Sequence, residues 1–371
     1  MRKDCGTTTA AESELTKITD WYDTGSLALN RVISGGDIYK GIPKGKVVTI
    51  YGDSQSGKSL IASQTAANAL KNGKIDVIYY VDSEGGGTGI LENLGVDMNR
   101  VEYIPVHSVE KCAVQLLKLY DSFIKMHEEY VNDPDNNDDI RAIVILDSLG
   151  NLKADKLISD AVNKDTQVQD MGLSQKLANS MLAGLTMRVQ ESGVTLLVIT
   201  HTYDQTNSMF PSKIKPLPGG KKVEFASHVI VQTTKLLIKA NNDDFLTGKE
   251  TEKTKAFFKG NRLNFFCWKN RCGKPGYEAN IYLDFDTGIS KYDGLIESAV
   301  ELGFLEEVRG GYSCPTYKDG KKITYREIVA NDEIWNTFID KFNEQSIKKL
   351  SYATSIDDEI KQINEDIDEE D

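Results

Sequence analysis

The 371-residue sequence lacks any apolar run long enough to cross a bilayer, and residues 1–9 lack the apolar stretch of a signal peptide. Cytoplasm is the expected location, and no membrane partner is expected. Internal repeats are absent as well. With 40% hydrophobic residues, a chain of this length is expected to bury one large core and a smaller appendage.

Cysteine is scarce and shows no pairing pattern. The five cysteines form no CxxC pair, and Cys267 and Cys272 have no histidine close by in sequence. Neither a disulfide framework nor a zinc site is indicated, so all five are expected to be reduced thiols.

Basic charge is also in deficit. The net charge of −12 argues against a uniformly basic nucleic-acid binder. The charge is unevenly placed, however, because residues 357–371 hold nine acidic residues and one lysine. Without this acidic tail the rest of the chain is only mildly negative, so the position of the charges matters more than their total.

The most informative stretch that is present fits the pattern GxxxxGK[ST] in full. It consists of Gly52, Asp53, Ser54, Gln55, Ser56, Gly57, Lys58 and Ser59. In such a loop, backbone N–H groups and a helix N-terminus surround phosphates, the lysine reaches the β- and γ-phosphates, and the final hydroxyl ligates Mg²⁺. Residues 47–51 indicate a buried strand and residues 60–70 a helix, which is the context that this motif needs. The sequence therefore predicts a site for a nucleoside triphosphate and Mg²⁺.

Strand and helix patterns alternate after this loop. Strand-like runs occupy residues 76–82, 101–106, 141–147 and 195–200, and helical patterns occupy residues 109–130 and 173–190. This alternation predicts an α/β fold with a mostly parallel sheet flanked by helices. Three further runs, at 229–238, 262–269 and 279–285, follow without long helices between them, which predicts antiparallel strands at one end.

Three polar residues come at the ends of predicted strands. Asp147 ends an apolar strand, as in a Walker B element that positions Mg²⁺. Glu84 follows the strand after the phosphate loop and is a candidate to activate the attacking water, or else is an exposed loop acid. His201 is a candidate sensor of the γ-phosphate that signals to the following loop, or else is an ordinary edge histidine.

Taken in order, these motifs resemble the RecA recombinase family, and most closely its phage branch, the UvsX type. The resemblance covers roughly residues 20–312 and also rests on the strings TGSLAL (24–29), LGVD (94–97), DSLGNL (147–152) and THTY (200–203). It implies ATP and Mg²⁺ as cofactors, with Lys58 and Ser59 holding the triphosphate and metal, Glu84 activating water and Asp147 serving as the Walker B carboxylate.

The resemblance also implies a residue pair that acts on a neighbouring subunit. Lys269 and Arg271 match the paired cations that reach into the next subunit's ATP site and stabilise transition-state charge. From the residues alone, two cations around Asn270 are equally consistent with a solvated strand end.

Two segments resemble the family's DNA-binding loops. Residues 153–173 match the first loop and residues 202–220 the second. Their candidate DNA contacts are Met171, Gly172 and Lys176, and then Met209, Phe210, Lys213, Lys215, Gly219 and Gly220, with Lys221 and Lys222 beside the second loop. Cations along a backbone and apolar groups between bases suit a single strand with little sequence preference. A mobile surface loop is the alternative for the second segment.

Some features depart from the family pattern. Residues 85–90 are one residue shorter than expected and hold no aromatic to stack on adenine, so base preference is open. His201 stands where bacterial members have glutamine, as in the phage branch. A long N-terminal helix is not evident.

The resulting prediction is a recombinase that forms helical filaments on single-stranded DNA and exchanges strands with homologous duplex in recombination, repair and recombination-dependent replication. Single-strand-binding and mediator proteins are expected partners, in the host cytoplasm if a phage encodes the chain. The alternatives are a hexameric replicative helicase on the same core and a regulator that binds ATP without hydrolysing it.

Four regions are expected. They are an N-terminal oligomerisation segment (1–20), a RecA-like ATPase core (21–292), a small C-terminal lobe that captures duplex DNA or only packs (293–351), and a disordered acidic tail (352–371). The tail is interpreted either as a solvated end or as a polyanion that competes with DNA for basic loops.

Overall fold

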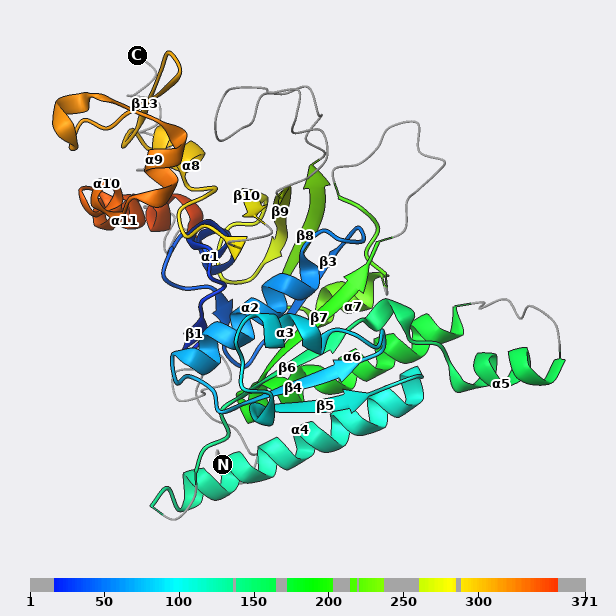
Figure 1. The fold of residues 1–371 in the computed structure, drawn as a ribbon. Coiled ribbons are helices and arrows are strands. Elements are labelled where there is room, and N and C mark those ends of the chain that lie inside the picture. Colours follow the sequence, from blue (N-terminus) through cyan, green and yellow to red (C-terminus); the bar gives the residue numbers. More distant parts are fainter. Residues whose placement is uncertain are drawn as a thin grey trace.

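A twisted sheet with helices on both faces forms the centre of the molecule (Figure 1). The computed structural model describes residues 17–135, 138–164, 172–202, 214–218, 220–236, 260–284 and 288–352. Within these residues the main sheet has nine strands in the order β11-β10-β9-β8-β3-β7-β6-β4-β5. The parallel strands are β3 (Val47–Gly52), β4 (Val77–Asp82), β5 (Val101–Pro105), β6 (Ala142–Asp147), β7 (Thr195–His201) and β8 (Val229–Leu236).

Three antiparallel strands extend the sheet beyond β8. They are β9 (Gly260–Asn270), β10 (Tyr277–Asp284) and β11 (Gly288–Ile289). The predicted fold class, a mostly parallel sheet with antiparallel strands at one end, is therefore confirmed.

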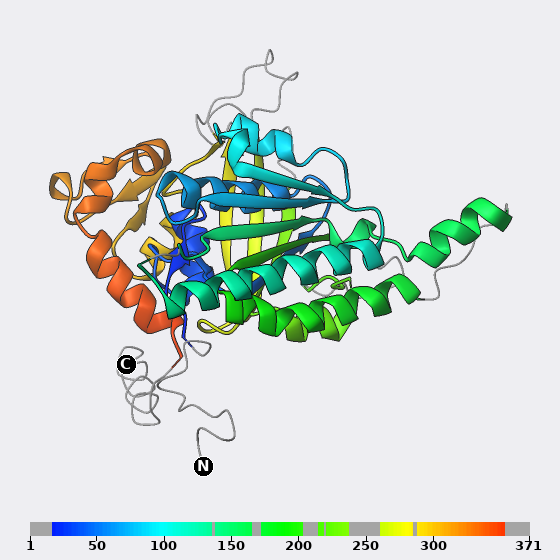
Figure 2. The same ribbon diagram turned by 90° about the horizontal axis from the view of Figure 1, so that it is seen from below.

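Successive residues of the central strands pack into different cores. In β6, Ile145 belongs to the cluster that contains Ala62 of helix α2 (Lys58–Lys71), whereas Leu146 belongs to the cluster that contains Leu182 of helix α6 (Leu173–Ser192). This alternation follows from the two-residue period of a strand. The second face is covered by α4 (Val109–Asn132) and α6 (Leu173–Ser192), which run side by side in Figure 2. Both faces of the central parallel strands β3, β6 and β7 are buried, as their near-continuous apolar sequences predict, whereas β5 at the end of the sheet is partly exposed.

The remaining elements of the core are short. They are β1 (Trp21–Tyr22), α1 (Leu27–Ser34), β2 (Ile42–Pro43), α3 (Thr88–Asn93), η3 (Met98–Arg100), η4 (Leu149–Asn151), α5 (Asp155–Lys164) and α7 (Gly220–Ala226). No helix among the described residues is long and apolar enough to pass through a membrane. The four cysteines in these ranges, Cys112, Cys267, Cys272 and Cys314, are free thiols.

The C-terminal residues form a small lobe with its own three-stranded sheet. Its elements are α8 (Ile296–Glu301), β12 (Glu306–Val308), β13 (Gly311–Ser313), η5 (Lys318–Gly320), β14 (Lys322–Ile323), α9 (Tyr325–Ala330), α10 (Asp332–Asn336) and α11 (Ile339–Leu350). Trp335 is fully buried and stacks on Tyr292 with ring centroids 4.9 Å apart. These side chains belong to the same apolar cluster as α1 and α2, so the lobe shares a core with the main domain.

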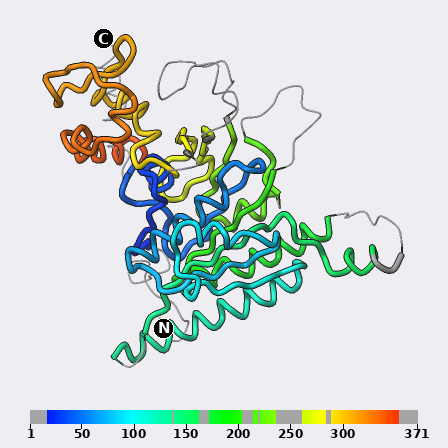
Figure 3. Tube along the Cα trace, viewed as in Figure 1, coloured from blue at the N-terminus to red at the C-terminus, as the bar shows by residue number. Residues whose placement is uncertain are grey.

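Polar contacts also fasten the lobe to the N-terminal part of the core. The buried guanidinium of Arg31 donates from Nε to Ser346 Oγ at 2.7 Å. The backbone N–H of Ile38 donates to Asn343 Oδ1 at 2.9 Å. In Figure 3 the red C-terminal segment lies next to a dark-blue segment from the N-terminal part of the core.

One local expectation differs from the structure. Part of the first expected DNA loop is helical, because α5 occupies residues 155–164 and projects from the body in Figures 1 and 2. In the C-terminal lobe, residues 325–350 are divided among the three helices α9, α10 and α11. Asn331 causes one break, since its side chain caps α10 by accepting from the N–H of Glu333 at 2.9 Å.

Candidate active site

One edge of the sheet collects the polar residues that the sequence singled out. Gly52 pairs with His201 in the β3–β7 ladder, and Asp82 pairs with Asp147 in the β4–β6 ladder. Because β3, β4, β6 and β7 are parallel, their carboxyl ends lie at the same edge. The phosphate loop, His201, Asp147 and the start of the Glu84 loop are therefore neighbours, as predicted from strand ends.

The phosphate loop (residues 52–59) connects β3 to α2. Gly57 has a φ of +83°, a conformation that favours glycine, and a Cβ there would lie 2.6 Å from Leu263 Cδ1. At Gly52 a Cβ would lie 2.0 Å from the carbonyl oxygen of Thr233. Ser56 Oγ donates to the carbonyl of Asp53 at 2.7 Å, and Ser54 and Gln55 are exposed. Gly57 provides no side-chain cap, which leaves the N-terminus of α2 suited to an anion.

Lys58 is held within this loop. Its side chain is only 4% exposed, and Nζ donates to the carbonyl oxygen of Asp53 at 2.6 Å. Burial lowers the pKa of Lys58, while the negative charges of Asp147, Glu84 and Asp53 oppose that shift. A triphosphate would supply further negative charge to this buried ammonium, so the residues present fit a nucleotide.

Asp147 offers a place for a metal ion. Its Oδ2 accepts from the hydroxyl of Tyr80 at 2.7 Å, whereas its Oδ1 is buried and has no hydrogen-bond partner among the described residues. Burial raises the pKa of Asp147, although the nearby hydroxyls of Ser59 and Tyr80 favour the ionised form. A buried carboxylate oxygen beside a serine hydroxyl matches the oxygen ligands of Mg²⁺. No group of three or more His, Cys, Asp or Glu side chains in the described ranges forms a metal cage of its own.

Glu84 is oriented by several neighbours. Its Oε1 accepts from Asn151 Nδ2 at 2.9 Å and lies 2.8 Å from His201 Nε2. The carboxylate of Asp82 accepts from the backbone N–H groups of Glu84, Gly85 and Gly86 at 2.7, 2.8 and 3.1 Å. Burial disfavours the charge on Asp82, but these amides lower its pKa below the usual value.

Sequence reasoning missed the roles of Asp82 and Asn151. An aspartate two residues before Glu84 was a usable signal, because such a side chain bonds the following backbone amides. Asn151 comes 67 positions after Glu84 and gives no comparable signal.

Lys269 and Arg271 lie at the opposite edge of the sheet. Lys269 pairs with Ile230, near the start of β8, whereas the phosphate loop follows the end of β3. Nζ of Lys269 donates to the carbonyls of Glu224 and Ser227, the latter at 2.8 Å, and Arg271 donates to the carbonyl of Phe225 at 3.3 Å. Burial, followed by the charge of Arg271, lowers the pKa of Lys269 to about 8. The structure does not bring these cations to the nucleotide loop of their own chain.

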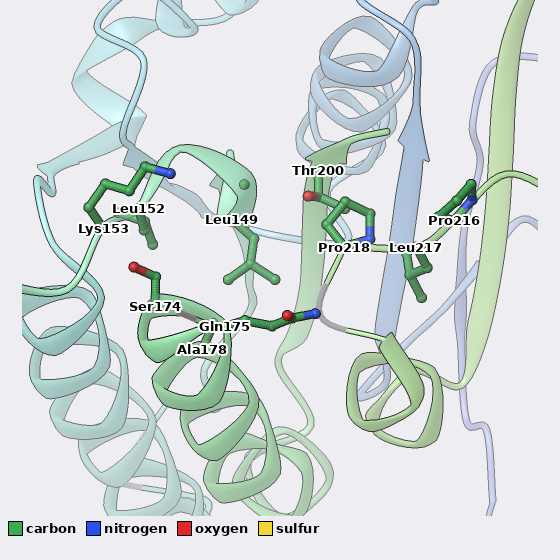
Figure 4. A pocket seen from close by; sticks show the side chains of 12 residues that line it. Leu149, Leu152, Lys153, Ser174, Gln175, Ala178, Thr200, Pro216, Leu217 and Pro218 are labelled. Carbon is green, nitrogen blue, oxygen red and sulfur yellow. The ribbon is translucent and has the colours of Figure 1, made fainter. Parts of the chain in front are cut away.

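The ends of the two expected DNA segments meet at a cavity of about 360 Å³ (Figure 4). Lys153 and Ser174 line it beside the first segment, and residues 216–218 line it beside the second. Three of the expected DNA contacts lie nearby in the chain. Gly172 precedes α6 and also lines the cavity. Lys176 lies on the first turn of α6, and Gly220 begins α7. Met171, Met209, Phe210, Lys213 and Gly219 lie outside the described residues. Lys215 contacts the phosphate loop, because its Nζ lies 2.6 Å from Asp53 Oδ1.

Comparison with known proteins identifies related sequences along most of the chain. The family model of the RecA N-terminal domain matches residues 6–290. The "Recombination and repair protein" of Enterobacteria phage T4 is 26% identical over 310 residues, which cover 83% of this chain and 70% of that protein. "Protein RecA" of Campylobacter hominis is 25% identical over 357 residues, covering 95% and 90%, and that of Rhodococcus jostii is 27% identical over 328 residues, covering 87% and 82%. The matched residues include the phosphate loop, Glu84 and Asp147, and also Lys269 and Arg271 at the opposite edge of the sheet.

Proposed function

This chain belongs to the RecA family and is a RecA-type recombinase, and from that premise we propose that it hydrolyses ATP with Mg²⁺ in a DNA-dependent reaction. We further propose that it acts as a helical filament on single-stranded DNA. Its DNA substrates are then an unpaired strand and a homologous duplex.

The separation of charged residues between two sheet edges carries the filament proposal. The nucleotide edge holds Lys58, Glu84 and Asp147, whereas Lys269 and Arg271 occupy the opposite edge. Lys269 and Arg271 can therefore reach only the phosphates that are bound to another copy of this chain. A contact that joins one edge of a subunit to the other edge of the next is heterologous, and repetition of such a contact gives a ring or an open helix.

The proposed chemistry assigns one task to each group at the nucleotide edge. Lys58 and the loop amides would bind the triphosphate, and Ser59 and Asp147 would hold Mg²⁺, which supplies neutralising charge when bound. Glu84 would orient the attacking water and accept its proton, with His201 and Asn151 fixing the direction of its carboxylate. Lys269 and Arg271 of the adjacent subunit would stabilise negative charge in the transition state.

DNA would bind at the ends of the two segments beside the cavity of Figure 4. Both segments begin near the nucleotide edge: residues 149–151 follow β6, and Thr202 follows β7. Backbone phosphates would meet Lys176 and the amide of Gly220, whereas the ammonium of Lys215 pairs with Asp53. This arrangement suits sequence-independent binding of one strand. Single-strand-binding and mediator proteins remain predicted partners.

Neither alternative function is favoured. The names of the relatives concern recombination and repair, which does not favour a replicative helicase. The close placement of Glu84, His201 and Asn151 supports turnover rather than nucleotide binding alone.

The experiment measures ATP hydrolysis with and without single-stranded DNA, and joint-molecule formation against duplex unwinding. We expect DNA-stimulated turnover, abolished in Lys58→Ala, together with pairing of homologous strands. Unwinding without pairing contradicts the filament proposal in favour of a helicase. Absence of turnover, with Glu84→Gln indistinguishable from wild type, contradicts the ATPase proposal.

A further inference from the structure

Asp53 is the second residue of the phosphate loop, and its carboxylate joins three parts of the chain. Lys215 Nζ lies 2.6 Å from Oδ1 and 2.7 Å from Oδ2 of Asp53. The hydroxyl of Thr202 donates to Oδ1 at 3.0 Å. Thr202 and Lys215 flank residues 203–214, of which 203–213 lie outside the described residues. One side chain of the nucleotide site therefore contacts both borders of the second expected DNA segment.

Both borders are also fixed to the strand that leads into the phosphate loop. The backbone N–H of Thr202 donates to the carbonyl of Gly52 at 3.1 Å. The carbonyl of Lys215 accepts from the hydroxyl of Tyr51 at 3.1 Å, and its N–H donates to Gln232 Oε1 at 2.7 Å. Tyr51 Oη also lies 3.0 Å from Gln232 Oε1, so its single hydroxyl hydrogen is shared between that oxygen and the carbonyl oxygen of Lys215. Lys215 is thus anchored by its backbone, and its ammonium is directed to Asp53.

The same residue contacts the group that meets the nucleotide. The backbone carbonyl of Asp53 accepts from Lys58 Nζ at 2.6 Å and from Ser56 Oγ at 2.7 Å. If Lys58 turns to bind phosphate, it leaves this carbonyl, so the hydrogen bonding of Asp53 changes when a triphosphate binds. An unpaired carboxylate beside a triphosphate would also repel it, whereas Lys215 neutralises the charge of Asp53.

We propose that Asp53 is a positioning residue that couples nucleotide binding to DNA binding through its contacts with Thr202 and Lys215. The inference rests on the proposed function. A change of the phosphate loop on nucleotide binding moves the Asp53 carboxylate, and the carboxylate moves the two borders of the DNA segment. Because coupling free energy is reciprocal, bound DNA improves nucleotide affinity through the same contacts by the same factor.

The test measures this coupling factor directly. The affinity for a fluorescent single-stranded oligonucleotide is determined by anisotropy, without nucleotide and with a slowly hydrolysed ATP analogue and Mg²⁺. The analogue is used at a concentration that a separate titration shows to saturate each variant. The variants are Asp53→Asn, Lys215→Met, their combination, and Asp53→Glu as the conservative replacement.

Asp121→Asn is the matched control. Asp121 Oδ1 lies 2.6 Å from Arg188 Nε on the α4–α6 face, away from the nucleotide edge, and this pair is also partly exposed. The control removes a carboxylate of similar geometry without touching the phosphate loop.

The gain in oligonucleotide affinity caused by the analogue should fall about fivefold or more in Asp53→Asn and in Lys215→Met. A factor of about five is the lower end of measured coupling factors between two sites. The combined variant should lose no more than the single variants, because the two side chains act as one unit. Asp53→Glu should retain more of the gain than Asp53→Asn, and Asp121→Asn should retain all of it. A general loss of stability would lower the oligonucleotide affinity both with and without the analogue. The ratio of these two affinities would then stay unchanged.

Two results would overturn the inference while leaving the proposed function intact. One is a full analogue-dependent gain in Asp53→Asn when wild type shows the gain. The other is an equal loss in Asp121→Asn. If wild type itself shows no analogue-dependent binding of the oligonucleotide, the proposed function fails instead.

Discussion

The assignment of Lys269 to the neighbouring subunit's nucleotide site makes a quantitative prediction for mixed assemblies. Lys58→Ala removes the phosphate-binding cation but leaves the opposite edge intact, and Lys269→Ala does the reverse. Ile230, the partner of Lys269, is aligned with Thr49, three residues before the phosphate loop begins at Gly52. That offset alone is about 10 Å along the strand. Lys269 therefore should not serve the phosphate loop of its own chain.

Each variant alone should be inactive in DNA-stimulated turnover, and Lys269→Ala should still bind nucleotide as a free subunit. In an equimolar mixture that assembles at random, about a quarter of the heterologous contacts should combine an intact phosphate loop with an intact opposite edge. Turnover should recover to about that fraction of wild type. The assay is steady-state ATP hydrolysis on single-stranded DNA, with energy transfer between differently labelled variants to show co-assembly.

Co-assembly without any recovery would refute the reasoning, because intact groups would then be present on adjacent subunits without forming a site. Loss of nucleotide binding by free Lys269→Ala would also refute it, because Lys269 would then serve its own chain.

Three further predictions concern Lys269, Glu84 and the acidic tail. The pKa of Lys269, lowered to about 8, predicts that turnover decreases as the pH rises through about 8, because the ammonium loses its proton. At pH 7 about nine-tenths of the Lys269 side chains would be charged. A pH–rate profile checks this, and the residual turnover of Lys269→Arg should not show the decrease, since arginine stays charged. Glu84→Gln should reduce hydrolysis by about 10²-fold or more while nucleotide still binds, which single-turnover kinetics with a binding titration can separate. A Glu84→Gln rate close to wild type would remove the general-base role. Deleting residues 357–371 should strengthen duplex binding most at low salt, where charges are least screened; unchanged binding would make the tail a spacer.

Much of the architecture could be predicted because the informative signals are local. The central parallel strands β3, β6 and β7 are short apolar runs buried on both faces, and the phosphate loop is a contiguous motif between a strand and a helix. Once β3, β4, β6 and β7 are known to be parallel, the ends of their sequences indicate which polar residues share an edge. Asp147, His201 and Glu84 could be grouped in this way.

The unpredicted features depend on contacts between distant parts of the chain. Asn151 reaches Glu84 because a short 3-10 turn follows β6, and no periodicity encodes that meeting. Lys215 was predicted as a DNA contact from its position at the end of a loop. Its contact with Asp53 arises because Tyr51 and Gln232 hold its backbone beside β3.

The C-terminal lobe illustrates the same limit. A small lobe could be predicted from the sequence, but the cap at Asn331, which separates two of its helices, was not predicted. Its shared core with α1 requires contacts across about three hundred positions, such as Arg31 with Ser346. The proposed boundary at residue 293 remains a prediction.

Electron microscopy of the purified protein with single-stranded DNA, Mg²⁺ and a slowly hydrolysed ATP analogue tests the central claim most directly. The account predicts open helical filaments in which nucleotide density lies between the phosphate loop of one subunit and Lys269 and Arg271 of the next. Closed rings, isolated subunits, or filaments with nucleotide enclosed within a single chain would contradict it.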